Sequence, residues 1–141
     1  MLTAYHLSQH RPEPLAAANG EVPREAAWLD LINPTAEEDQ RTEASLGISL
    51  PTREEAREIE FSSRFYVENG AVYMTAILLT GVEADEPRLS PMTFVVADNR
   101  LVTLRYDEFR AFKQFMALAG KPGSQCTDAA SVFTMIQTLI N

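Results

Sequence analysis

Two dipeptides that favour tight turns, Asn69-Gly70 and Asp98-Asn99, constrain the fold of this chain more than any other feature. Apolar runs lie on both sides of each: RFYVE and AVYMTAILL flank the first, and PMTFVVA and RLVTLRY flank the second. Asn-Gly supplies the positive φ angles that both central residues of a type I′ turn require, and Asp-Asn is a less ideal version of the pair. The pattern therefore predicts two antiparallel β-hairpins, over residues 64–79 and 92–106.

The apolar runs ILL and FVV within these hairpins are continuous rather than alternating. Continuous runs are typical of strands covered on both faces, as in layered α/β folds. Further strands are predicted at 2–7 and 26–32, separated by a proline-rich loop over 8–26, and the polar segment 83–91 is predicted to connect the hairpins. We therefore expect one α/β domain over residues 1–141, a three-layer α/β/α structure with a mixed, largely antiparallel sheet.

Two helices are predicted from their N-terminal signals. Thr35 is followed three residues later by Glu38, and Thr52 is followed in the same way by Glu55. This spacing is the capping-box signature, in which the hydroxyl and the carboxylate satisfy each other's backbone amides. Gly47 is expected to end the first helix, because glycine adopts the left-handed conformation at low cost.

Two more helices are predicted near the C-terminus. The helix over 108–119 has an apolar face that we expect to be buried. Asp128 is expected to cap a last helix whose apolar stripe still continues at Asn141, so we expect this helix to be cut by the end of the chain. The apolar residues of the two faces are Phe109, Phe112, Phe115 and Met116, and then Val132, Phe133, Ile136, Leu139 and Ile140.

Charge and composition argue against several classes of partner. The formal net charge of −8 argues against nucleic acid, which needs a basic surface, and against an anionic membrane surface. No apolar run approaches the roughly 20 residues of a membrane-spanning helix, and the N-terminus lacks the features of a secretory signal. The single cysteine, Cys126, favours a reducing compartment, because it has no partner for an internal disulfide.

Recognised catalytic patterns are missing from the sequence, so we do not expect an enzyme. It contains no GxSxG, HExxH, paired CxxC or GxGxxG. His6 and His10 are four residues apart on an extended segment without a third ligand nearby, and we interpret them as surface residues. Gly120-Lys121 does not belong to a phosphate-binding loop, because Pro122 takes the place of the hydroxyl that would bind magnesium.

Acidic residues concentrate in the middle of the chain. Residues 36–60 contain eight acids and three arginines. In the helix that begins after Thr52, Glu58 lies four residues after Glu54 and three after Glu55, so the three carboxylates share one side and repel one another. Two interpretations remain open at this point: a solvated helix face with favourable dipole placement, or a site for a hard divalent cation such as Mg²⁺, which prefers oxygen ligands.

Several segments together resemble the cytoplasmic N-terminal domain of CorA-type magnesium transporters. They are WLDL at 28–31, LGI at 46–48, PTREEAREIEFSSRFY at 51–66 and FVVADNRLVTLR at 94–105. Their order and spacing extend from about Trp28 to the end of the chain. The block at 51–66 is the most specific part of the resemblance.

The resemblance implies a function that the residues alone do not show. CorA-type proteins are homopentameric channels that carry magnesium, and also cobalt and nickel, through the bacterial inner membrane. Their cytoplasmic α/β/α domain leads into a stalk helix and two transmembrane helices with a Gly-Met-Asn loop, which this sequence does not contain. We therefore expect a regulatory, cation-sensing domain on the cytoplasmic side of the membrane, linked to the membrane only through those missing helices.

The resemblance also implies a regulatory metal site. In the family, an acidic pair after the LGI motif faces an acid on the stalk of a neighbouring subunit. Counted from Gly47, this pair falls on Glu54 and Glu55. Glu58, which shares their side of the helix, is our own weaker candidate for a ligand. Without the stalk, we expect a monomer or dimer that binds cations weakly. A zinc-transporting branch of the same family and a free-standing soluble binding module are the alternatives.

Overall fold

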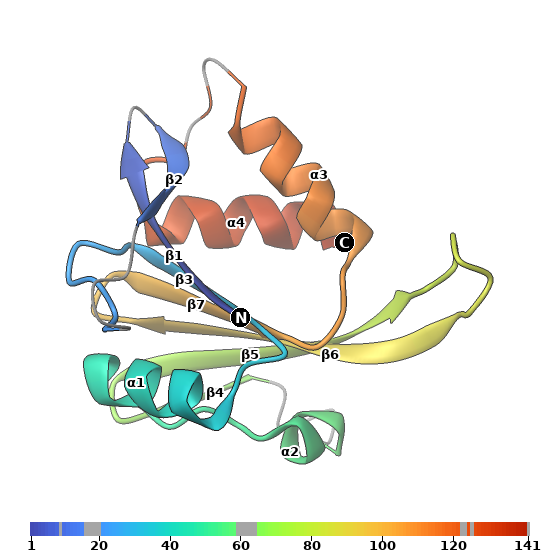
Figure 1. Ribbon diagram of the computed structural model, residues 1–141, viewed down its shortest axis with the longest axis horizontal. Coiled ribbons are helices and arrows are strands. Elements are labelled where there is room, and N and C mark those ends of the chain that lie inside the picture. The colour runs from blue at the N-terminus through green and yellow to red at the C-terminus, as the bar shows by residue number, and fades with distance from the viewer. Residues whose placement is uncertain (9, 16–20, 59–64, 122–123, 125, 141) are drawn as a thin grey trace.

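The computed structural model describes residues 1–8, 10–15, 21–58, 65–121, 124 and 126–140. A seven-stranded sheet in the order β2-β1-β3-β7-β6-β5-β4 forms its centre (Figure 1). The strands are β1 (Leu2–Ser8), β2 (Arg11–Leu15), β3 (Trp28–Ile32), β4 (Phe65–Glu68), β5 (Ala71–Thr80), β6 (Arg88–Ala97) and β7 (Arg100–Arg105).

The sheet is mixed and largely antiparallel, as predicted: β3 and β7 pair in parallel, and the other neighbours are antiparallel. Both predicted hairpins are present. The φ angles are 50° and 79° at Asn69 and Gly70, and 49° and 58° at Asp98 and Asn99, so both turns have the positive φ angles expected of type I′. Arg64, the first residue of the predicted hairpin, lies outside the described residues.

The prediction for residues 83–91 was wrong in its second half. β6 begins at Arg88 and pairs with β5 from Thr80↔Arg88 to Val72↔Val96, so the two predicted hairpins are joined in one four-stranded meander. The sequence did not reveal the start of this strand, because its first two residues, Arg88 and Leu89, are both exposed and show no alternation of buried apolar and exposed polar residues.

The predicted loop over 8–26 contains a strand that the sequence did not reveal. β2 has the sequence RPEPL, and it pairs with β1 at the sheet edge, with Leu7 opposite Pro12 and Tyr5 opposite Pro14. Proline lacks a backbone N–H and is therefore confined to edge strands, where the missing donor can face solvent. Two prolines thus argued for a loop, although an edge strand tolerates them.

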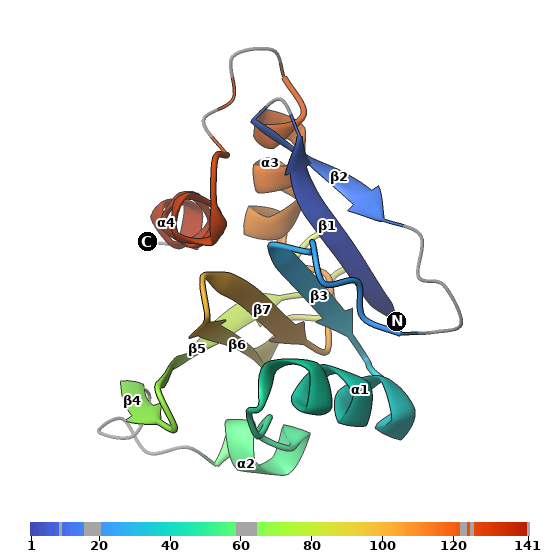
Figure 2. The same ribbon diagram turned by 90° about the vertical axis from the view of Figure 1, so that its left-hand side faces the viewer.

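Two helices cover each face of the sheet, which confirms the three-layer α/β/α prediction (Figures 1 and 2). α1 (Ala36–Leu46) and α2 (Arg53–Arg57) lie on one face, and α3 (Arg110–Ala119) and α4 (Ala129–Ile140) lie on the other. Gly47 ends α1 in the left-handed conformation, with φ 66°. The Asp128 carboxylate accepts a hydrogen bond of 2.8 Å from the amide of Ser131, as expected of the cap of α4. Asn141 lies outside the described residues.

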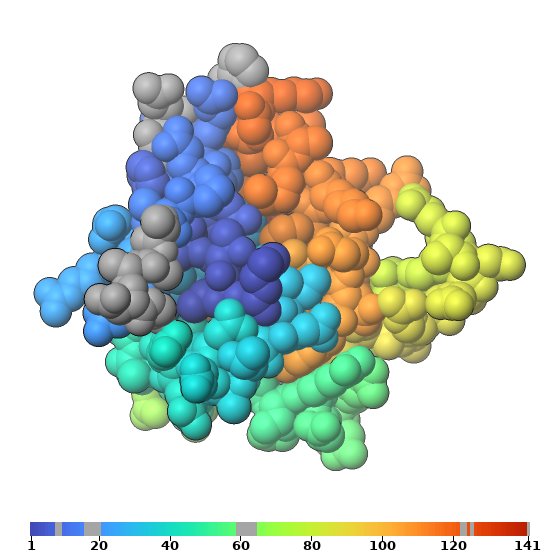
Figure 3. All heavy atoms as spheres, in the orientation of Figure 1, coloured from blue at the N-terminus to red at the C-terminus, as the bar shows by residue number. Residues whose placement is uncertain are grey.

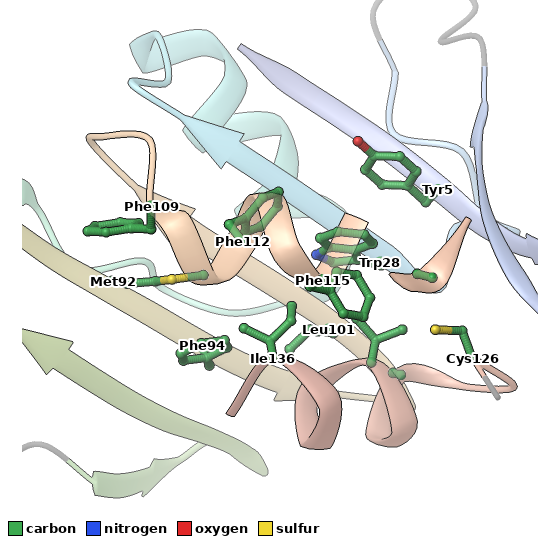
Figure 4. Packing of buried hydrophobic residues seen from close by; sticks show 13 residues of the cluster. Tyr5, Trp28, Met92, Phe94, Leu101, Phe109, Phe112, Phe115, Cys126 and Ile136 are labelled. Carbon is green, nitrogen blue, oxygen red and sulfur yellow. The ribbon is translucent and has the colours of Figure 1, made fainter. Parts of the chain in front are cut away.

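The face beneath α3 and α4 is closed by aromatic packing. Figure 4 shows Trp28 among the rings of Tyr5, Phe112 and Phe115. Its centroid lies 4.5 Å from Tyr5, stacked, and 5.5 Å from Phe115, edge to face. The predicted core role of Phe112, Phe115 and Phe109 is confirmed, since each is 5% exposed or less.

The end of the β5–β6 hairpin projects from the body (Figures 1 and 3). We call residues 79–89 the arm. The continuous run ILL predicted strands covered on both faces, and this was wrong for its last residue: Leu79 is 61% exposed. By contrast, β6 from Ser90 onward and β7 are almost entirely buried.

Candidate functional site

α2 carries the three predicted metal ligands, and its capping box holds it in place. The amide of Glu55 donates to the Thr52 hydroxyl over 3.1 Å, and the Glu55 carboxylate accepts from the Thr52 amide over 3.3 Å. Ala56 is 1% exposed and is the buried contact of this short helix. The remaining side chains of α2 are therefore turned outward.

Tyr106 anchors α2 to the sheet. The Arg53 guanidinium carbon lies 5.2 Å from the centre of its ring, a cation–π contact. Burial is the largest cause that raises the pKa of Tyr106 to about 12; the charges of Asp39 and Glu54 act in the same direction, and that of Arg53 opposes them. Acids from both α1 and α2 thus lie close enough to this half-buried phenol to act on it.

The three predicted ligands lie on the surface, but they differ in their hydrogen bonds. Glu54, Glu55 and Glu58 are all exposed. One oxygen of Glu55 is engaged in the capping box, whereas Glu54 and Glu58 have no side-chain hydrogen bond or ion pair within the described part of the chain. The amide of Glu58 donates to the carbonyl of Glu54 over 3.0 Å, so the two residues are stacked one turn apart.

Within the described residues, no three histidine, cysteine, aspartate or glutamate side chains are gathered so as to hold a metal ion. The geometry instead presents carboxylate oxygens on an open surface. Such a surface supplies part of a coordination shell, and water or a second molecule must supply the rest.

Sequence reasoning missed a buried polar network between β3 and β7. Asp30 and Arg105, at 3% and 4% exposure, form a two-pronged ion pair with N···O distances of 3.1 and 2.9 Å. Thr103 donates to Asp30 over 2.7 Å and accepts from the indole of Trp28 over 3.0 Å. The signal was an aspartate inside the apolar run WLDLI and an arginine that ends the apolar run RLVTLR.

Arg105 extends the network to the start of α3. It donates to the Glu108 carboxylate over 3.1 Å, and its guanidinium carbon lies 3.7 Å from the centre of the Phe112 ring. Burial lowers the pKa of Arg105, but the hydrogen bonds and charges of Asp30 and Glu108 outweigh burial and raise it. The charged guanidinium therefore joins β3, β7 and α3, a structural role.

The other candidate residues have ordinary surroundings. His6 lies 3.4 Å from Glu13 on the neighbouring strand, and His10 is exposed. Cys126 is buried, with its Sγ 3.5 Å from the sulfur of Met135. Among the described residues, no helix has the length and apolar character needed to cross a lipid bilayer.

Comparison with solved structures finds three proteins with a similar fold. The complete CorA magnesium transporter of Methanocaldococcus jannaschii matches 99% of this chain and 44% of its own chain, with a TM-score of 0.69 and 16% identity. The soluble domain of the same protein matches 99% of this chain and 55% of its own, with a TM-score of 0.68 and 14% identity. The full-length CmaX protein gives a TM-score of 0.67 at 12% identity.

Sequence relatives agree with the fold. The magnesium transport protein CorA of Sodalis glossinidius is 34% identical to this chain over 115 residues, and that of Escherichia coli K12 is 32% identical. Each alignment covers 82% of this chain and 36% of the relative, so the chain spans about a third of the length of these proteins. The family described as CorA-like Mg²⁺ transporter protein matches residues 24–141. This chain therefore belongs to the CorA family of magnesium transporters.

Proposed function

We propose that this chain is the cytoplasmic cation-sensing domain of a CorA-like divalent-cation channel, and that Glu54, Glu55 and Glu58 are ligands of its regulatory Mg²⁺. The transported ions in this proposal are magnesium and, as for the family, cobalt and nickel. One observation supports the proposal most strongly. The chain belongs to this family, and the glutamates of α2 are exposed, two of them without a side-chain partner in the described part of the chain.

These residues suit the ion. Mg²⁺ is a hard cation that usually keeps several of its waters and binds proteins through one or two carboxylates. Glu54 and Glu58, one helical turn apart, offer two such carboxylates on the same side, and Glu55 offers the oxygen that its capping bond leaves free. Like charges at this spacing destabilise a helix by roughly 0.2–0.5 kcal/mol per pair, and a bound cation removes this cost.

The site is completed across a subunit boundary in this proposal. The full-length protein is a homopentamer in which α2 of one subunit faces an acid of its neighbour. While the carboxylates of both subunits share the ion, they hold the closed arrangement together. When internal magnesium falls, the same carboxylates repel one another and the equilibrium shifts toward the open pore.

The test is inhibition of ion uptake by internal magnesium in the full-length protein. We compare the triple variant Glu54→Gln, Glu55→Gln and Glu58→Gln with the unchanged protein. Glutamine removes each charge, and at Glu55 it keeps an oxygen that accepts the capping bond. We expect the variant to need a higher internal magnesium concentration for closure, with uptake at low magnesium retained.

A matched control removes three acids elsewhere on the surface: Glu21→Gln, Glu25→Gln and Glu68→Gln, all exposed. We expect the control variant to close at the same magnesium concentration as the unchanged protein. If the α2 variant closed as readily as the control, these glutamates would not be the regulatory ligands.

A further inference from the structure

Arg53 occupies an unfavourable place in α2. It is the first residue of the helix, and its side chain is exposed. A cation in the first turn lies against the positive end of the helix dipole, where acids are favoured instead. Glu54 and Glu55 come directly after Arg53, yet Arg53 forms no ion pair in the described part of the chain. An aromatic ring holds its guanidinium instead.

That ring belongs to Tyr106, directly after β7. The guanidinium carbon of Arg53 lies 5.2 Å from the ring centre, within the distance of about 6 Å at which a cation and a ring attract each other. The charge of Arg53 also reaches the next residue. Burial raises the pKa of the Asp107 carboxyl, but the pair with Arg88 and the charge of Arg53 outweigh burial and lower it. The guanidinium therefore lies toward the end of β7.

Tyr106 is a fixed point for this contact. Its half-buried ring packs against the apolar cluster beneath α1 and α2. The residue before it, Arg105, forms a buried ion pair with Asp30 on β3, with an N···O distance of 2.9 Å. The residue after it, Asp107, forms an ion pair with Arg88 of the arm. Both neighbours of Tyr106 are thus held by other strands.

α2 has few other attachments to the sheet. The helix is five residues long, and its capping box is internal to it. Ala56 is the buried side chain among these five residues, at 1% exposure, where the helix lies against β6. An alanine methyl group buries little apolar surface, so it limits the orientation of the helix only weakly. The contact between Arg53 and Tyr106 adds a second point of attachment.

We propose that Tyr106 is a positioning residue for the cation site of α2. Its ring holds the guanidinium of Arg53, and this contact keeps the helix in the orientation that presents its three glutamates to one ion. The inference rests on the proposed function, because it takes α2 as the site of the regulatory cation. Ligands that are held in place before the ion arrives bind it more tightly, because less of the protein is ordered on binding.

The test is the affinity of the chain for Mn²⁺, an ion that prefers oxygen ligands as Mg²⁺ does. Broadening of the amide signals of residues 53–58 measures it as Mn²⁺ is added. Tyr106→Leu removes the ring, and we expect the affinity to fall about two- to fivefold, the effect of one exposed cation–π contact. Tyr106→Phe keeps the ring and should bind Mn²⁺ as the unchanged chain does.

A double-mutant cycle shows whether Tyr106 acts through Arg53. In a chain that carries Arg53→Gln, the ring has no guanidinium to hold, so we expect Tyr106→Leu to have no further effect on the affinity. A ring that served only to pack the core would weaken binding in this chain as well.

Arg57→Gln provides the matched background, because it removes the same charge from the same helix. Arg57 is exposed, and it has no ring contact or ion pair in the described part of the chain. In a chain that carries Arg57→Gln, we expect Tyr106→Leu to cause its full loss of about two- to fivefold. Tyr106→Met is a second variant without a ring, and the same results are expected of it in each background.

Two results would overturn the positioning role: an unchanged affinity in Tyr106→Leu, or an equal loss in the Arg53→Gln background. Both leave the proposed function standing, because broadening at residues 53–58 still locates the ion at α2. If the unchanged chain showed no broadening there, the proposed function would fail and the positioning role with it. Far-ultraviolet circular dichroism of every variant checks that the fold is retained.

Discussion

α1 and α2 begin with the same sequence signal, but their acidic side chains make different contacts. Each has a threonine cap, a complete capping box and acids in its first turn. In α1, Glu38 and Glu43 are connected to other parts of the molecule, whereas in the described part of the chain Glu37 pairs only with Arg41 of the same helix. Glu38 accepts hydrogen bonds from the amides of Leu2, over 2.6 Å, and Thr35, over 3.0 Å, and Glu43 accepts from the amide of Leu50 over 3.0 Å.

In α2 the acidic side chains form no contacts with distant parts of the described chain. Glu55 closes its own capping box, and Glu54 and Glu58 have no side-chain partner in the described part of the chain. The comparison shows that a capping box and an acidic first turn specify a helix start but do not specify what the acids do. We infer that Glu38 and Glu43 of α1 support the fold, whereas the acids of α2 are available to a ligand.

Among the acids that support the fold, we expect Asp30 to contribute most to the free energy of unfolding. Changing Asp30→Ala leaves the buried charge of Arg105 without its main partner, and breaking a buried pair in this way costs about 3–5 kcal/mol. We expect urea denaturation to show a loss of this size. Asp85→Asn, at an exposed turn position, is the control and should change stability little. A small loss at Asp30 would mean that the network is not needed for the fold.

Glu38→Ala tests the acids of α1. The change leaves the amides of Leu2 and Thr35 without their acceptor, and we expect it to lower the free energy of unfolding by about 1–2 kcal/mol. Glu37→Ala removes an exposed pair with Arg41 and should cost less than about 0.5 kcal/mol. Equal losses from the two changes would remove the distinction drawn for α1.

The pH dependence of stability also tests the contribution of the Glu38 carboxylate to the fold. Burial raises the pKa of Glu38, but hydrogen bonds from Thr35 and Leu2 and the terminal ammonium outweigh it, so the pKa is lowered from 4.5. A lowered carboxyl pKa contributes stability above the unfolded value and loses it as pH falls through the folded value. The stability difference between the unchanged chain and Glu38→Ala should therefore shrink as the solution is acidified below pH 4.5.

The smallest effect on stability is expected for α2. Replacing Glu54, Glu55 and Glu58 by glutamine should change the free energy of unfolding by less than about 0.5 kcal/mol, because exposed side chains are altered and the capping bond is retained. Urea denaturation of the triple variant beside Glu38→Ala measures the contrast directly. A loss in the triple variant as large as that of Glu38→Ala would place the acids of α2 among the structural ones.

Local sequence signals predicted much of this fold. The two type I′ turns, both capping boxes and the phenylalanine face of α3 are each encoded within a few residues, and all were confirmed. Signals of this kind succeed because the interactions that they describe lie within one turn or one helix.

Features that depend on distant parts of the chain were not predicted. β2 is a strand because β1 offers it a partner at the sheet edge, and its two prolines gave the opposite signal. Asp30 and Arg105 are 75 residues apart, so nothing local shows that they pair. The difference between α1 and α2 is of the same kind, because the partners of Glu38 include the first strand of the chain.

Paramagnetic broadening by Mn²⁺ tests the central claim, that the acids of α2 are available to a hard cation while Glu38 and Glu43 of α1 are engaged in the fold. Mn²⁺ shares the preference of Mg²⁺ for oxygen ligands, and its effect on amide signals locates even a weakly bound ion. The account predicts that the signals of residues 53–58 broaden first and that the triple glutamine variant loses this effect. Broadening that began in α1, or that was the same in the triple variant, would contradict it.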